Sequence, residues 1–293
     1  MQTKTIDVKA MAEEEISSVS QAVLRSGAKH ALTTSTPYLA AVGLLSTLAG
    51  WYLLCEFFKV PYFNELPGPV AVAREWFSRN PKFGLSIYTP EYYQHICRST
   101  WRVIQAFLWA TALGVPLGLF MGWEKTFKDY TFPVLELLRR IPMLAWVPLA
   151  VLMFPGREGS VIYVTFLGAF FATTLNTLLG VQSIDEVYLR AARCLGSSSR
   201  QVFFRIILPG ALPFIFTGLQ ISMGYSWFCL IAGEMIAGEY GLGYLIWTSY
   251  ITVAAPVLVI AMVTLGFLGW VSTAAIRLIG RCLMQWQVRE MAQ

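Results

Sequence analysis

Long runs of apolar residues, with no alternation between apolar and polar positions, are the dominant pattern of this chain. A run of about 20 apolar residues can cross a bilayer as an α-helix, and in lipid only helices and closed barrels satisfy their own backbone hydrogen bonds. Because the runs lack the period of two that is typical of barrel strands, they predict helices. Six segments have this character: 37–58, 99–123, 131–154, 160–182, 206–237 and 250–279. We therefore predict an all-α polytopic membrane protein with six transmembrane helices.

The composition supports lipid as the main solvent of the chain. Apolar residues make up 56% of the 293 residues and charged residues 13%, whereas about a quarter of a typical soluble domain is charged. Mean hydropathy is +0.57. The net charge of +5 comes from basic residues that do not cluster with aromatic side chains. Membrane lipid is therefore an expected partner, and nucleic acid is not.

The distribution of Lys and Arg predicts the orientation. With the N-terminus inside, most of these residues fall in inside segments, as they do in the cytoplasmic loops of membrane proteins. We therefore expect both termini in the cytoplasm, with a tail at 1–36, a transmembrane domain at 37–280 and a second tail at 281–293. The polar start of the chain does not resemble a signal peptide. Residues 13–30 predict either a short helix at the membrane surface or a disordered tail.

The cytoplasmic loop between the fourth and fifth segments, residues 183–205, has the signals of two short helices. Ser183 and Glu186 have the spacing of a capping box, and Gly196 stands where a left-handed residue ends a helix. Ser198 and Gln201 predict a second start. Periodicity alone leaves two interpretations open: an amphipathic helix that rests on lipid headgroups, or a knob that docks into a partner protein. The apolar positions that share one face of the first helix are Ile184, Val187, Ala191 and Leu195.

The sequence of this loop resembles a known motif. Ala191-Ala192-x-x-x-Gly196, followed by Ile206-x-Leu208-Pro209, is similar to the "EAA" loop of the permeases of ATP-binding-cassette (ABC) importers. In that family the loop forms a coupling helix that inserts into a cleft of the ATPase subunit. One position departs from the motif, because Arg190 stands where the family has Glu. The resemblance implies the following coupling residues: Asp185, Glu186, Arg190, Ala191, Ala192, Leu195, Gly196, Leu208 and Pro209.

Further segments resemble the nitrate, sulfonate, taurine and bicarbonate branch of this family. They lie at 65–72, 114–122, 136–148 and 233–244. The resemblance implies a type I ABC importer permease fold in the inner membrane, with a second permease copy in a homodimer. It also implies two cytoplasmic ATPase subunits that carry ATP and Mg, and an extracytoplasmic solute-binding protein. The expected function is the import of a small solute, favouring an anion, by alternating access.

Three charged residues, Glu136, Arg139 and Arg140, lie inside the third apolar segment. A charge near the bilayer centre costs roughly 2.5–3.5 kcal/mol on insertion scales, so such residues face a partner or a water-filled path. Glu136 and Arg139 are three apart and share a helix face. Either they form a structural ion pair beside a kink at Pro142, or an arginine adds positive potential to the path of an anion. Trp146, just beyond the kink, is a candidate for lining that path or a packing residue.

The end of the fifth segment carries Glu234, the only acid in that segment. It is either a brace of the outer gate or the acceptor of a hydrogen bond at the end of a helix. Gly238, Gly241 and Gly243 permit a tight turn before the last span. We retain Glu234, Gly241 and Gly243 as candidate gate residues.

Several motifs of other protein classes are missing from the sequence. The ATP-binding motif G-x-x-x-x-G-K-[ST] does not occur, so ATP is expected on a partner chain. The hydrolase motif G-x-S-x-G does not occur either, so an enzyme is not expected. The five cysteines are scattered, and His30 and His95 have no metal-ligand spacing, so we expect no metal and no cofactor in this chain. A secondary transporter or channel acting alone is the alternative function, and a membrane enzyme is a third.

Overall fold

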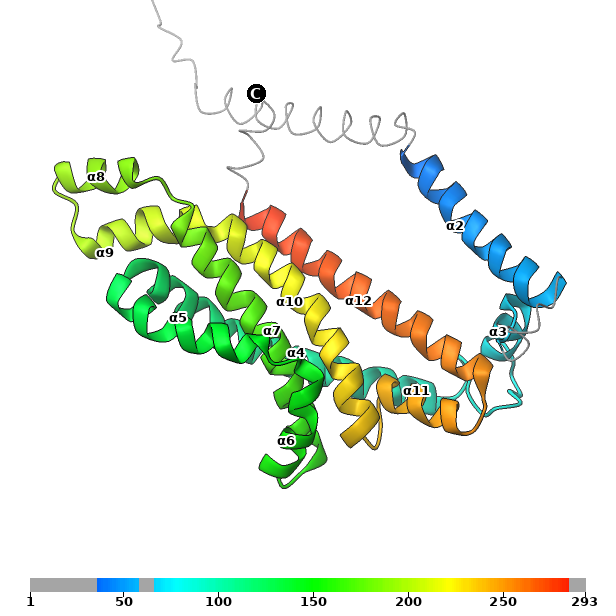
Figure 1. Cartoon of the computed structure of the whole chain (residues 1–293). Helices are drawn as coiled ribbons and strands as arrows, with labels where there is room; N and C mark the ends of the chain where they lie inside the picture. The colour runs from blue at the N-terminus through cyan, green and yellow to red at the C-terminus, as the bar shows by residue number, and fades with distance from the viewer. Residues whose placement is uncertain (1–35, 58–65, 285–293) are drawn as a thin grey trace, which may run out of the picture. The chain divides into compact units, whose positions relative to one another are not determined.

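The computed structural model describes residues 36–57 and 66–284. All regular elements among these residues are helices (Figure 1), which confirms the all-α prediction. The surface helix considered at 13–30 and nearly all of the two tails lie outside the described residues. The chain divides into two compact units, residues 1–70 and 71–293, and each is described by itself.

The first unit contains α2 (Thr36–Tyr52) and a π-helical continuation, η1 (Leu53–Phe57). Residues Tyr38–Phe57 form a candidate membrane span of 20 residues. At 1.5 Å per residue this helix covers about 30 Å, which is the thickness of the hydrocarbon core. The first predicted segment is therefore confirmed as one helix of spanning length.

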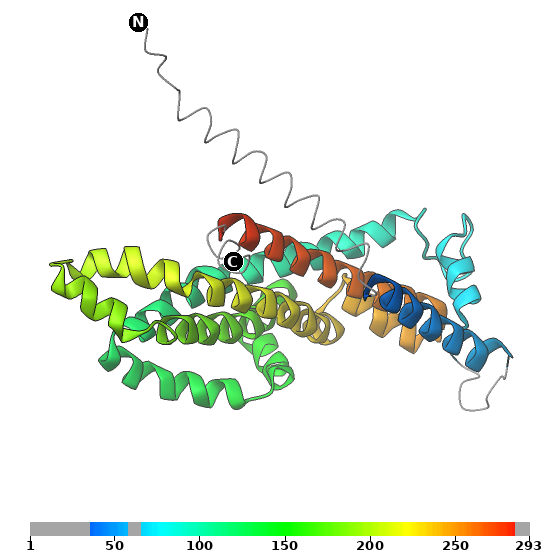
Figure 2. The same ribbon diagram turned by 90° about the horizontal axis from the view of Figure 1, so that it is seen from above.

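The second unit is built on long apolar helices that pack side by side (Figures 1 and 2). The centre is α7 (Arg157–Gln182), which packs between α4 (Pro90–Trp123) and α10 (Leu208–Ala237). The sequence allows this because glycines of α4 let the backbones approach. A Cβ added at Gly118 would lie 2.5 Å from the carbonyl oxygen of Thr174. Small residues at membrane helix contacts serve this purpose.

Two further helices of the second unit, α11 and α12, pack against α10 and against each other. A short helix, α3, begins at the end of the first unit and runs into the second, and the last span is longer than predicted at its C-terminal end. An additional short helix, α11, precedes that last span. The bounds are α3 (Pro69–Trp76), α11 (Leu242–Ile251) and α12 (Ala255–Leu283).

The third predicted segment, 131–154, is interrupted at the kink that Pro142 predicts. The chain forms α5 (Lys125–Arg140), breaks, and continues as η3 (Met143–Ala145) and α6 (Trp146–Met153). The break has a local cause, because Pro142 removes an amide donor and disfavours helical geometry at the preceding residue. Ile141 is accordingly extended, with ψ 122°. The described residues hold five helices long and apolar enough to span a membrane and a shorter apolar helix at Met143–Met153, so the count of six is not confirmed.

The two short helices between α7 and α10 lie at one end of the bundle, and α11 lies toward the other (Figure 1). They are α8 (Glu186–Cys194) and α9 (Ser199–Val202), and a π-helical stretch, η4 (Phe203–Ile207), joins α9 to α10. The ring of Trp123, at the C-terminal end of α4, packs edge-on against Phe203 with 5.6 Å between centroids. Both ends of the bundle carry candidate functional residues.

Candidate functional site

The start of α8 differs from the predicted capping box. Asp185 caps the helix, because its carboxylate accepts a hydrogen bond of 2.9 Å from the backbone N–H of Val187. Ser183 is still in helical geometry, and its hydroxyl donates back to the carbonyl of Gly180 in α7. A residue in helical geometry cannot serve as the extended cap of the next helix. The predicted cap at Ser183 is therefore wrong, and the helix begins at Glu186, directly after its cap at Asp185.

The end of α8 and the start of α9 agree with the predictions. Gly196 has a φ of +77°. The N–H of Ser197 bonds to the carbonyl of Ala192, and the N–H of Gly196 to that of Arg193, which is the Schellman pattern. Ser198 and Gln201 then form the predicted capping box. Two well-formed helix ends on either side of one glycine give the loop a defined shape.

The candidate coupling residues divide between an inner and an outer face of this loop. Ala192 is buried with Val202, Ile207 and Ala211, so this face fixes the loop to α10. The opposite face exposes the apolar side chains of Val187, Tyr188 and Leu195, the last of which is 86% exposed. The predicted apolar stripe of α8 is thus mainly the outward one, and an exposed apolar patch marks a contact surface for a partner.

Arg190, which departs from the family motif, has a partner within the helix. Its guanidinium lies 2.8 Å from the carboxylate of Glu186, one turn earlier, and both side chains are exposed. Leu208 and Pro209 form the first turn of α10, directly after the π-helical stretch η4.

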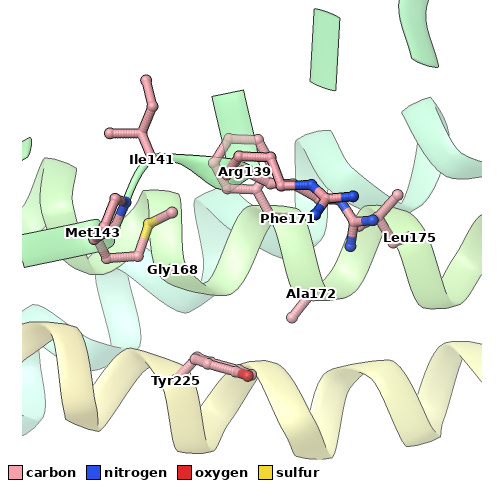
Figure 3. Close-up of a pocket in the computed structure, with 10 residues that line it drawn as sticks. Arg139, Ile141, Met143, Gly168, Phe171, Ala172, Leu175 and Tyr225 are labelled. Atoms are coloured by element: carbon pink, nitrogen blue, oxygen red, sulfur yellow. The ribbon is translucent and has the colours of Figure 1, made fainter. Parts of the chain in front are cut away.

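The charged cluster of α5 lies beside a hollow of about 400 Å³. Glu136 accepts hydrogen bonds of 2.6 and 2.7 Å from Arg139 and of 2.8 Å from Arg140. The pairing of Glu136 with Arg139 is as predicted, but two guanidinium groups share one carboxylate, and the cluster keeps one positive charge. Figure 3 shows Arg139 on one wall of the hollow and Tyr225 of α10 on the opposite wall.

Trp146 is not one of the residues that line this hollow. It is partly buried and packs against the apolar clusters that contain Phe171 and Val147. Its indole nitrogen is buried and has no hydrogen-bond partner among the described residues.

Glu234 lies at the other end of the bundle and is completely buried. Its carboxylate accepts hydrogen bonds from Ser99 (2.8 and 2.9 Å), from Arg102 (2.7 Å) and from the N–H of Gly243 (2.8 Å). Gly241 has a φ of +130°, and a Cβ there would lie within 2.4 Å of the same carboxylate. Glu234 therefore fixes the turn between α10 and α11, and only glycine fits at position 241.

Sequence reasoning missed the partner that neutralises Glu234. Arg102 of α4 is 3% exposed and binds Glu234, the carbonyl of Tyr240 and, with two nitrogens, the carboxylate of Glu158 in α7. The available signal was a charged residue inside an apolar segment, and the same kind of signal identified Glu234. The described residues contain no cluster of side chains suited to a metal ion.

Comparison with known proteins identifies the family of this chain. The model of the binding-protein-dependent transport system inner membrane component matches residues 114–292. The nitrate import permease NrtB of Synechocystis sp. is 34% identical over 78% of this chain and 82% of its own length. The chain belongs to the binding-protein-dependent transport system inner membrane component family. The taurine transport permease TauC of Escherichia coli is 36% identical to this permease, over 66% of this chain and 70% of its own length.

The fold of the permease has a counterpart among solved structures. An inward-facing structure of the MetNI methionine ABC transporter matches with a TM-score of 0.55 and 20% identity, over 66% of this chain and 95% of that chain. This permease therefore has the type I importer fold. Its family makes it a multi-pass inner-membrane subunit of an ABC importer. It is a transport subunit, not an enzyme, and an ATPase and a solute-binding protein are its partners.

Proposed function

We propose that this permease imports a small anion by alternating access, driven by ATP hydrolysis on two ATPase subunits that carry the ATP and Mg. Relatives are named for the import of nitrate, taurine and bicarbonate, each of which carries an oxyanion group. The observation that carries the proposal is the surplus positive charge of Arg139 and Arg140 over Glu136 beside the hollow. A permease for uncharged solutes has no need of it.

The hollow offers hydrogen-bond donors in addition to this charge. The Nη1 atoms of Arg139 and Arg140 and the hydroxyl of Tyr225 have no hydrogen-bond partner in the described part of the chain. Guanidinium groups bind carboxylate, sulfonate or nitrate oxygens through paired N–H donors. Met143 and Phe171 add apolar surface to the same walls. The hollow therefore suits an oxyanion whose remaining part is small or apolar.

The loop at 183–205, called the coupling loop below, supports the proposed coupling of transport to ATP hydrolysis. The exposed face of Val187, Tyr188 and Leu195 docks on the ATPase subunit, and the buried face passes the movement to α10. Coupling of this kind is a rigid-body movement carried by packed elements. The proposal places the loop and both termini in the cytoplasm, with tails at 1–36 and 281–293 and the permease domain at 37–280. A second copy of the chain completes a homodimer around the path.

The experiment that tests this function is ATP-dependent uptake by a reconstituted complex. The permease is co-expressed with its ATPase and solute-binding protein and assayed in proteoliposomes with nitrate, taurine and bicarbonate. We expect uptake of at least one of these solutes that requires ATP and the binding protein. Leu195→Asp should keep the complex assembled but abolish the stimulation of ATPase activity by solute. ATP-independent uptake by the permease alone would overturn the proposal in favour of a secondary transporter.

A further inference from the structure

A second polar hollow, of about 320 Å³, lies at the end of the bundle opposite the coupling loop. It is enclosed by the loop before α4, the first turns of α4, and α11 with the start of α12. One wall is held by Glu75, which is buried and accepts hydrogen bonds from the backbone N–H of Phe83 (2.7 Å) and of Lys82 (3.2 Å). Ser86 and Thr89 bond to each other in the same loop. The hollow is therefore preformed, which lowers the entropic cost of binding.

Two buried polar side chains of this hollow lack hydrogen bonds on the side that lines it. His95 is 8% exposed, and its Nδ1 lies 3.0 Å from both the nitrogen and the oxygen of Gly241. Its Nε2 has no hydrogen-bond partner within residues 36–57 and 66–284. Ser249 is 4% exposed, and its hydroxyl likewise has none there. Both atoms are open to the hollow, so the hydroxyl of Ser249 can accept a hydrogen bond from a side chain that enters it. Because Nδ1 of His95 accepts from the N–H of Gly241, its Nε2 carries the hydrogen and can donate to a carbonyl oxygen of the same partner.

The other polar groups of the hollow are acceptors. Glu91 contributes a full negative charge. The hydroxyls of Thr248 and Thr252 donate their hydrogens to backbone carbonyls, at 3.0 and 2.9 Å, which leaves their lone pairs free. Leu85 and Leu245 add apolar surface. One negative charge among acceptors with apolar walls fits the side chain of Lys or Arg, which has a cationic head with several donors and an apolar stem.

We propose that this hollow receives a Lys or Arg side chain of the extracytoplasmic solute-binding protein. The position argues for this partner. The 34 residues of α4 extend about 51 Å from the hollow to Trp123 at the coupling end. With the coupling loop on the cytoplasmic ATPase, an orientation that rests on the proposed function, the hollow faces the binding protein. Its surroundings also suit a protein contact, because Phe83 on its wall and Tyr250 and Val253 nearby are exposed, and aromatic side chains are enriched in interfaces.

The test uses the complete permease–ATPase complex in nanodiscs with its solute-binding protein. Glu91→Gln should weaken binding of that protein by roughly tenfold or more, because it removes the charge that faces the inserted side chain. Ser249→Ala should weaken it by about threefold, the effect of one neutral hydrogen bond. Basal ATPase activity and assembly should not change. Glu239→Gln is the matched control, because Glu239 is an exposed acid between α10 and α11 that does not line the hollow.

A charge exchange provides the second measurement. Glu91→Lys should block stimulation of ATPase activity by the binding protein, and a Lys→Glu or Arg→Glu change at one position of the binding protein should restore it. The docking proposal is overturned if Glu91→Gln binds like the unchanged complex, or if Glu239→Gln loses as much affinity, while ATP-driven uptake persists. If no ATPase assembles with the unchanged permease, the proposed function is itself wrong, and the docking proposal falls with it.

Discussion

The two ionic clusters of this permease contain the same kinds of groups and differ in their surroundings. In α5, two arginines share Glu136 on a surface beside a hollow. At the other end, the buried Arg102 lies between Glu234, which is also buried, and Glu158, which is 56% exposed. The α5 cluster has a positive charge in excess, and the Arg102 cluster has a negative one. The difference indicates that the Arg102 cluster fixes helices in place, whereas the α5 cluster keeps donors free for a ligand.

Removing the central arginine of the buried cluster should have the largest effect. Arg102→Gln leaves the carboxylate of Glu234 buried without a countercharge, and breaking a buried ion pair in this way costs about 3–5 kcal/mol. We expect a large loss of assembled complex and a lower Tm of what remains, measured by size-exclusion chromatography and thermal unfolding in detergent. Arg74→Gln, at an exposed arginine of α3, is the control. A normal yield and Tm for Arg102→Gln would show that the cluster does not support the fold.

A change at Gly241 should act on the same cluster through the backbone. Gly241→Ala places a Cβ against the Glu234 carboxylate at a φ that side chains rarely adopt, and the backbone strain alone costs about 1–3 kcal/mol. We therefore expect a smaller drop in Tm than for Arg102→Gln. Gly224→Ala is a suitable comparison, because no atom lies within 4 Å of the added Cβ. Equal Tm values for both alanine variants would contradict the proposed fit at position 241.

The exposed cluster should affect transport without affecting stability. The double change Arg139→Gln and Arg140→Gln removes charged donors, each worth about 1.5–3 kcal/mol in a hydrogen bond. We expect anion uptake to fall by roughly 10- to 100-fold while Tm and basal ATPase activity stay the same. Uptake is measured in proteoliposomes, with Arg74→Gln again as the control. Normal uptake by the double variant would show that these arginines do not contribute to the translocation path.

The smallest effect is expected from Glu136. Glu136→Gln releases both guanidinium groups and raises the surplus charge, so the KM for the anion should fall by a few fold at low ionic strength. The shift should shrink as salt is added, because these side chains are exposed or half-exposed and screened. An unchanged KM at every ionic strength would mean that the charge of the cluster does not reach the solute.

Local signals in the sequence predicted local structure well. The residues around Gly196 and Ser198 define the turn between α8 and α9, and Pro142 marks the break after α5. Ser183 was misassigned because capping-box spacing does not reveal whether the preceding helix has already ended. The pairing of Arg102 with Glu234 joins residues 132 positions apart. No periodicity within one segment can predict such a pair, because it depends on how α4 and α10 are placed by packing.

The glycine contacts along α4 have a mechanical consequence. Gly114, Gly118 and Gly122 place α4 directly against threonine and valine side chains of α7, at spacings that would clash with any added Cβ. The α4–α7 interface is packed so closely that sliding one helix along the other would cause steric clashes between side chains and backbone. We therefore expect α4 and α7 to move together as one rigid unit. The conformational change between inward- and outward-open states must then occur in segments that are not packed so closely, such as α5 and α6, which are separated by the helix break at Pro142.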